Sequence, residues 1–93
     1  MNEREQYMAL MSEIIQKQIV ILGPEIAVLK ARNVPEISIE NDGKVADIKG
    51  DPGQALEKLI DTYVELSGQI VRNALGSIFT KYPAVSAKQR SGA

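Results

Sequence analysis

The stretch from Asp51 to Tyr82 constrains this chain more than any other, because it has the pattern of one long helix. Apolar residues recur through it at intervals of three and four, which is the spacing of one helical face. A continuous helix of about 30 residues would be on the order of 45 Å long, whereas a compact chain of this size has a radius of gyration of about 12 Å. We therefore expect something outside the chain, such as a second copy, to cover part of this helix.

Both ends of the stretch carry helix boundary signals. Asp51 is suited to cap the first turn, Pro52 to occupy the first helical position, and Gln54 to complete a capping box. Pro83 ends the helix because it has no backbone N–H to donate. Amides at a helix N-terminus can also bind an anion, so residues 50–53 have an alternative role as an anion site. We favour capping, because the Asp51 carboxylate would occupy those amides itself.

The C-terminal half of the stretch combines apolar residues with several small ones. Small side chains let a second helix approach closely, although Gly68 and Gly76 have the alternative effect of loosening the helix. We predict the subunit contact in this half. The predicted oligomer interface consists of Leu66, Ile70, Val71, Ala74, Leu75, Ile78 and Phe79.

Residues 3–32 have the same helical spacing as the long stretch. Asn2 followed by Glu5 has the form of a capping box, so a helix is expected to begin at about Glu3. Asn33 can accept a left-handed conformation and Pro35 disfavours helix before it, so the helical region is expected to stop near residue 32. The apolar stripe consists of Met8, Met11, Ile15, Ile19, Leu22, Ile26 and Leu29, widened by Leu10, Ile14 and Ile21.

Gly23 and Pro24 interrupt this helical region. Either Gly23 ends one helix and Pro24 opens a second at its first position, or a single helix bends because proline crowds the preceding turn. The apolar stripe keeps its phase across the break. We therefore favour a kink, or a very tight break with the two pieces nearly coaxial.

Residues 36–48 change to the alternating period of β-strands and contain an Asp-Gly pair at the centre. This pattern predicts a hairpin with a two-residue type I′ turn at Asp42 and Gly43. The expected pairs are Asn41 with Lys44, Glu40 with Val45, Ile39 with Ala46, Ser38 with Asp47, and Ile37 with Ile48. The isoleucines and Ala46 then share one face, and Val45 lies on the other. An isolated hairpin is marginal in water, so we expect it to lie on the helices, with edges free to pair with a second copy.

The 93 residues have the composition of one small globular domain, with 44% hydrophobic and 25% charged residues. Cysteine, histidine and tryptophan are absent, which removes disulfides, the commonest general base and the commonest metal ligand. Glu57, Asp61 and Glu65 share one helical face, but a carboxylate metal site in a helix bundle normally adds histidines. We interpret these acids as a solvated face and predict no enzyme activity, no metal and no cofactor.

Charge is distributed unevenly along the chain. Residues 35–66 carry eight acidic and three basic residues, whereas residues 67–93 carry four basic residues and no acidic one. Residues 84–93 have too little apolar content to fold, and we predict a disordered basic tail. Lys81, Lys88 and Arg90 raise the alternative of a nucleic-acid-associated protein that uses this basic end. We favour a solubilising tail, because three charges are few and the middle of the chain is acidic.

The longest apolar run, Ile19–Leu22, is far shorter than the roughly 20 residues that span a bilayer. The N-terminus is polar and unlike a signal peptide. We therefore predict a cytoplasmic protein with no membrane association.

Together these features predict an α+β fold, mainly α, in residues 1–83, with the order α-α-β-β-α. A kinked N-terminal helix, a hairpin and a long C-terminal helix antiparallel to the first are expected to assemble as an intertwined homodimer or a dimer of dimers. The expected function is that of a non-catalytic homo-oligomeric interaction module, such as a small regulatory or adaptor protein. It would bind a protein partner of unknown identity through helix faces or the hairpin edge.

Overall fold

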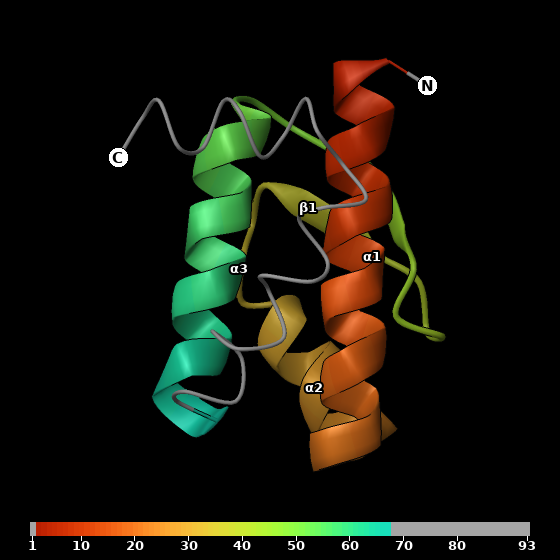
Figure 1. The fold of residues 1–93 in the computed structure, drawn as a ribbon, viewed down its shortest axis with the longest axis vertical. Helices are drawn as coiled ribbons and strands as arrows, with labels where there is room; N and C mark the ends of the chain where they lie inside the picture. The colour runs from red at the N-terminus through yellow and green to blue at the C-terminus, as the bar shows by residue number, and fades with distance from the viewer. Residues whose placement is uncertain (1, 68–93) are drawn as a thin grey trace.

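The computed structural model describes residues 2–67, which contain three helices and one two-stranded antiparallel hairpin (Figure 1). The elements are α1 (Glu3–Leu22), α2 (Pro24–Ala31), β1 (Ile37–Ile39), β2 (Val45–Ile48) and α3 (Pro52–Ser67). This order confirms the predicted α-α-β-β-α sequence of elements and the mainly helical α+β class. The rest of the predicted long helix, residues 68–82, and the predicted tail, residues 84–93, lie outside the described residues.

The side chains predicted to cap α1 and α3 do so. The Asn2 Oδ1 atom accepts a hydrogen bond from the Glu5 N–H at 2.8 Å, and the Asp51 Oδ1 atom accepts one from the Gly53 N–H at 3.0 Å. Each bond satisfies an amide that the first helical turn cannot pair internally. At the start of α3 the Asp51 carboxylate therefore occupies an amide that an external anion would need.

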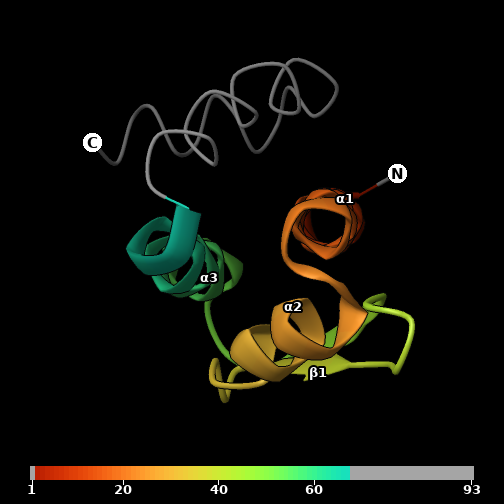
Figure 2. The ribbon, with the colours of Figure 1, turned by 90° about the horizontal axis from the view of Figure 1, so that it is seen from below.

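Gly23 separates α1 from α2 with a positive φ of 90°. Its N–H donates to the Ile19 carbonyl at 2.9 Å and closes α1, and Pro24 opens α2 at its first turn. Both views show α2 beside the C-terminal half of α1 and off its axis (Figures 1 and 2). The alternative in which Gly23 ends one helix and Pro24 opens a second, with a very tight break, is confirmed. The kink and the coaxial arrangement are wrong, because a residue at positive φ turns the chain instead of bending a continuous helix.

This turn also changes which face of α2 meets the core. The buried residues of α2 are Ala27, Val28 and Ala31, whereas Ile26 and Leu29, expected on the apolar stripe, are exposed. That expectation is wrong because an apolar stripe keeps its phase only along a continuous helix, and the chain turns at Gly23. The new helix starts with its own phase, and its small residues are the buried ones.

The hairpin confirms two of the five expected pairs and departs from the three nearest the turn. The observed pairs are Ile37 with Ile48, Ser38 with Asp47, and Ile39 with Val45. At the turn the Gly43 N–H donates to the Glu40 carbonyl, and the Glu40 N–H donates to the Lys44 carbonyl, both at 2.9 Å. Gly43 has a positive φ of 90° and no other residue of the loop does. This is the pattern of a three-residue loop with a glycine bulge, not of a two-residue type I′ turn.

Ala46 is an extra residue in β2, because Asp47 pairs with Ser38 and Val45 pairs with Ile39. It changes which side chains of β2 face the core. Val45 is buried and Ala46 is exposed, which is the reverse of the expected alternation. The irregularity lies at the step from Ser38 to Ile39. A bulge places two residues opposite one and so shifts the alternation by one position. As a result the larger apolar side chain enters the core.

The hairpin is held against α1 by its backbone, which confirms that it lies on a helix. The Ser12 hydroxyl accepts a hydrogen bond from the Val45 N–H at 2.9 Å and donates one to the Met8 carbonyl at 2.8 Å. The Gln16 Nε2 atom donates to the Asp42 carbonyl at 2.6 Å. Gly43 is also packed closely, since a Cβ atom there would lie 2.8 Å from the Ile15 side chain.

The two longer helices lie side by side and run in the same direction, from the top to the bottom of Figure 1. The expectation of an antiparallel pair is wrong, because α2 and the hairpin carry the chain back to the end where α1 begins. The core fills the space between these elements. It consists of Tyr7, Leu10, Met11, Ile14, Ile15, Ala31, Val34, Ile37, Val45, Ile48, Ala55, Leu56, Leu59 and Tyr63.

Candidate interaction surface

Four large apolar side chains are exposed around the turn between α1 and α2. Val20 is 84% exposed, Leu29 63%, Ile26 49% and Ile21 45%. We refer to these four residues as the α1–α2 corner. A single exposed apolar residue is ordinary on a protein surface, but a group of large ones indicates a contact surface.

The composition of α2 strengthens this interpretation. The helix buries its alanines, Ala27 and Ala31, and exposes its two largest apolar residues, Ile26 and Leu29. Burying an alanine removes much less apolar area from water than burying a leucine or isoleucine. The orientation of α2 therefore does not maximise burial within this chain, and it leaves its large side chains available to another molecule.

Two shallow pockets adjoin the corner. One has a volume of about 360 Å³ and is lined by Pro24, Glu25, Val28, Leu29, Arg32 and Asn41. The other has a volume of about 300 Å³ and is lined by Leu22, Gly23, Pro24, Glu25 and Ile26. Side chains from a docking partner could enter both, since the exposed apolar residues form parts of their walls.

Side chains from the helical region also engage the hairpin strands. The Arg32 guanidinium donates to the Ile39 carbonyl of β1 at 3.3 Å and to the Asn41 Oδ1 atom at 2.8 Å. On β2 the Val45 N–H already donates to Ser12. Each strand thus has a backbone group satisfied within the chain, which leaves less of its edge open for pairing with another strand.

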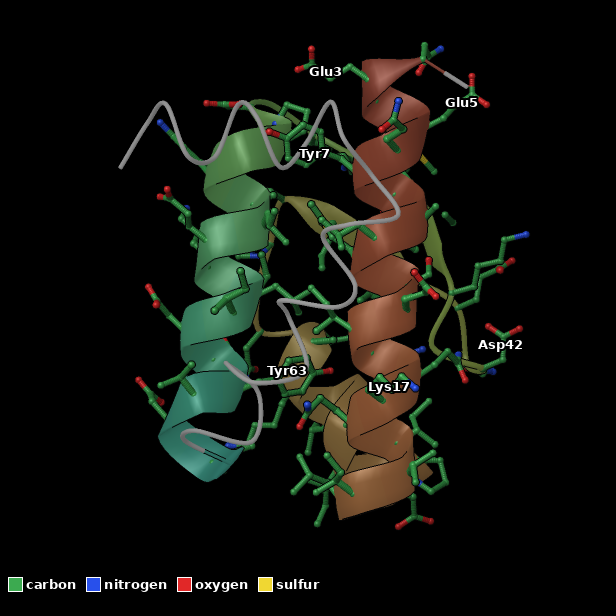
Figure 3. The ribbon with its side chains drawn as sticks, in the orientation of Figure 1. Glu3, Glu5, Tyr7, Lys17, Asp42 and Tyr63 are labelled. Atoms are coloured by element: carbon green, nitrogen blue, oxygen red, sulfur yellow. The ribbon has the colours of Figure 1, made fainter. Side chains whose placement is uncertain are left out.

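Tyr63 fixes α3 to the back of the corner. It is buried, and its hydroxyl donates to the Ala27 carbonyl of α2 at 2.6 Å. Figure 3 shows the side chain directed from α3 toward α2. Burial raises the pKa of the Tyr63 phenol far above its usual value, because the phenolate would lose its hydration. Tyr63 is therefore a core residue that remains a neutral hydrogen-bond donor at physiological pH.

Glu57, Asp61 and Glu65 are all exposed on α3, which confirms that they form a solvated face. Lys58 does not balance them as a helical neighbour would, because its ammonium pairs with Glu36. Within residues 2–67, no three acidic, histidine or cysteine side chains lie close enough to hold a metal ion together. The three carboxylates instead give α3 a negatively charged outer face.

Leu66 is the one member of the predicted oligomer interface that lies within the described residues. It is 44% exposed near the end of α3, so it is available for the predicted contact. The other members lie outside the described residues: Ile70, Val71, Ala74, Leu75, Ile78 and Phe79. The α1–α2 corner was missed as a surface, although Gly23 next to a run of large apolar residues could have indicated that the helical phase restarts there.

Comparison with known proteins found no match, whether to a family model, to a curated protein or to a solved structure. In the described part of the chain, no helix is both long and apolar enough to cross a membrane. What this chain does must therefore be inferred from its own surfaces.

Proposed function

We propose that this chain is a non-catalytic, homo-oligomeric interaction module, such as a small regulatory or adaptor protein, which binds a protein partner through helix faces. The observation that supports this proposal best is the α1–α2 corner, where four large apolar side chains are exposed beside two shallow pockets. Exposed apolar groups of this kind are typical of protein–protein contact surfaces.

The proposed assembly is a homodimer whose contact includes the C-terminal part of α3. Leu66 is exposed there, and the sequence continues with apolar and small residues at helical spacing as far as Phe79. We favour helix faces over the hairpin edge, because Arg32 and Ser12 already engage backbone groups of β1 and β2.

Sedimentation equilibrium at micromolar concentration tests the self-association. We expect a mass of about twice the 10.2 kDa of one chain. A single species of 10.2 kDa across the whole concentration range would contradict the proposal.

An Ala74→Arg variant tests where the subunits meet. A long cationic side chain in a packed apolar contact costs several kcal/mol when it has no partner, so we expect the variant to be a monomer. Lys88→Ala, a charge change in the predicted tail, is the control and should leave the mass unchanged. If the Ala74→Arg variant is still a dimer, the interface does not lie in residues 66–79.

Binding of a protein partner is tested with the intact chain as bait in a native lysate, alongside the Ala74→Arg variant and a bait-free matrix. We expect at least one protein to be retained specifically by the wild-type bait. Retention no different from the bait-free matrix would count against an adaptor role.

A further inference from the structure

Two surfaces of this chain carry opposite charge next to exposed apolar groups. The first is the α1–α2 corner, which is bordered by a basic rim of Lys17, Lys30 and Arg32. Glu25 lies between these residues in the sequence, and Asp42 of the hairpin turn lies near the rim because its carbonyl accepts a hydrogen bond from Gln16. The second is the acidic end of α3, which we define as Asp61, Glu65 and the apolar Leu66, all exposed.

Helical spacing and a shared pocket wall place the three rim residues beside the corner. Lys17 precedes Val20 and Ile21 of α1 by three and four residues, and Lys30 follows Ile26 of α2 by four, so each lies on the same helical face as its corner residues. Figure 3 shows Lys17 on the half of α1 nearest the corner. Arg32 lines one pocket together with Leu29.

Neither surface is neutralised by the ion pairs of the described residues. Those pairs are Arg4 with Asp47 and Lys58 with Glu36, and they involve no residue of the basic rim or of the acidic end of α3. The Arg32 guanidinium donates only to neutral acceptors, the Ile39 carbonyl and the Asn41 amide. Its positive charge is therefore still available to a carboxylate.

The two surfaces also face the same end of the molecule. The C-terminal ends of α1 and α3 and the turn into α2 are together at the bottom of Figure 1, and they face the viewer in Figure 2. In a two-fold symmetric dimer every contact occurs twice, so the acidic end of each α3 can meet the basic rim of the other copy. Each apolar Leu66 would then approach the apolar corner of its partner.

We propose that the α1–α2 corner is the surface on which a second copy of this chain docks, with the acidic end of the partner's α3 seated against the basic rim. This rests on the proposed self-association and specifies which face receives the partner. The complementary charges set the orientation of the two copies, while the corner and Leu66 provide the apolar area that is removed from water.

Charge reversal tests the docking. Each of two charge-reversed variants should lose dimerisation by itself, and mixing the two variants should restore it. A rim variant, Lys17→Glu with Lys30→Glu, and an α3 variant, Asp61→Lys with Glu65→Lys, each place like charges against each other twice in a symmetric dimer. We expect the dimer dissociation constant of each variant alone to rise on the order of a hundredfold. In an equimolar mixture, both contacts of the heterodimer pair opposite charges again, so association should return to within about tenfold of the wild type.

A matched control changes the same charge elsewhere. Lys49 is exposed just before α3 begins, and α3 begins at the end of the molecule opposite the turn into α2 (Figure 1), so Lys49→Glu should leave the dissociation constant within about threefold of the wild type. Far-ultraviolet circular dichroism and the thermal midpoint confirm that each variant is folded. Arg32 is left unchanged because it holds β1 and Asn41.

The outcomes separate the two proposals. A monomeric wild type would overturn the proposed self-association and this docking with it. A dimeric wild type whose reversed variants dimerise equally well, or whose mixed variants associate no better than each alone, would overturn only the docking at the corner. Weaker association of the wild type in 0.5 M salt, together with rescue in the mixture, is the expected result.

Discussion

The hairpin and the α1–α2 corner both adjoin α1, yet they use their apolar residues in opposite ways. The hairpin buries Val45 and Ile48 against the helices, and its backbone is held by Ser12 and Gln16. The corner exposes its largest side chains. The middle of α1 therefore stabilises the fold by holding the hairpin, whereas its last turn has apolar surface that is not needed for folding this chain.

The comparison also shows what limits each region. At the hairpin, close approach is the constraint, since Gly43 lies where no side chain fits beside Ile15. At the corner, nothing lies within 4 Å of a Cβ added to Gly23. Substitutions in the first region should act on folding, and substitutions in the second should act on association.

The largest expected contrast between the core and the corner is in the free energy of unfolding of Ile14→Ala and Leu29→Ala. Ile14 is fully buried in the core, so its truncation should lower the free energy of unfolding by about 4 kcal/mol at any protein concentration. Leu29→Ala should cost less than about 0.5 kcal/mol in dilute protein, because the side chain is exposed. Its cost should grow with concentration as the dimer forms. Urea denaturation at several concentrations measures both, and equal, concentration-independent losses would show that Leu29 belongs to the core.

Gly43→Ala tests the close approach of the hairpin to α1. The new Cβ atom would lie 2.8 Å from Ile15 and 2.9 Å from Ile19, at a positive φ, so we expect a loss of about 3 kcal/mol from overpacking and backbone strain together. Gly50→Ala is the matched control, with φ of 81° and open space around its Cβ position, and should cost only about 1 kcal/mol. Equal losses in urea denaturation would mean that contact with α1 is unimportant.

Tyr63→Phe tests the hydrogen bond that joins α3 to α2 on the buried side of the corner. Loss of the hydrogen bond to the Ala27 carbonyl should cost about 1 kcal/mol at neutral pH. Because burial raises the pKa of Tyr63 in the folded chain, its contribution is complete below the unfolded pKa of about 10. Above that pH the wild type should lose stability relative to the variant by about 1.4 kcal/mol per pH unit.

Urea midpoints of the wild type and Tyr63→Phe between pH 8 and pH 11 provide the measurement. The difference between the two proteins removes the effect of lysines and of other tyrosines, which both share. Parallel curves over this range would show that the Tyr63 hydroxyl is not buried in solution.

The sequence by itself determined the elements of this fold and where they begin. Asn2 and Asp51 cap their helices as predicted, and the Asp42-Gly43 pair marks the hairpin turn. These features depend on hydrogen bonds between residues a few positions apart, so local chemistry is sufficient to predict them. For the candidate surface, Leu66 is exposed, and its place in an oligomer interface stays a prediction.

The tertiary structure alone decided how these elements face one another. The positive φ of Gly23 directs α2 back beside α1 and exposes Leu29, and the bulge in β2 turns Val45 into the core. In both places one residue at a break sets the phase of everything after it, and periodicity counted through the break cannot show this. The direction of α3 relative to α1 likewise depends on the path of the chain between them. The α1–α2 corner exists only because these orientations leave large apolar side chains on the outside.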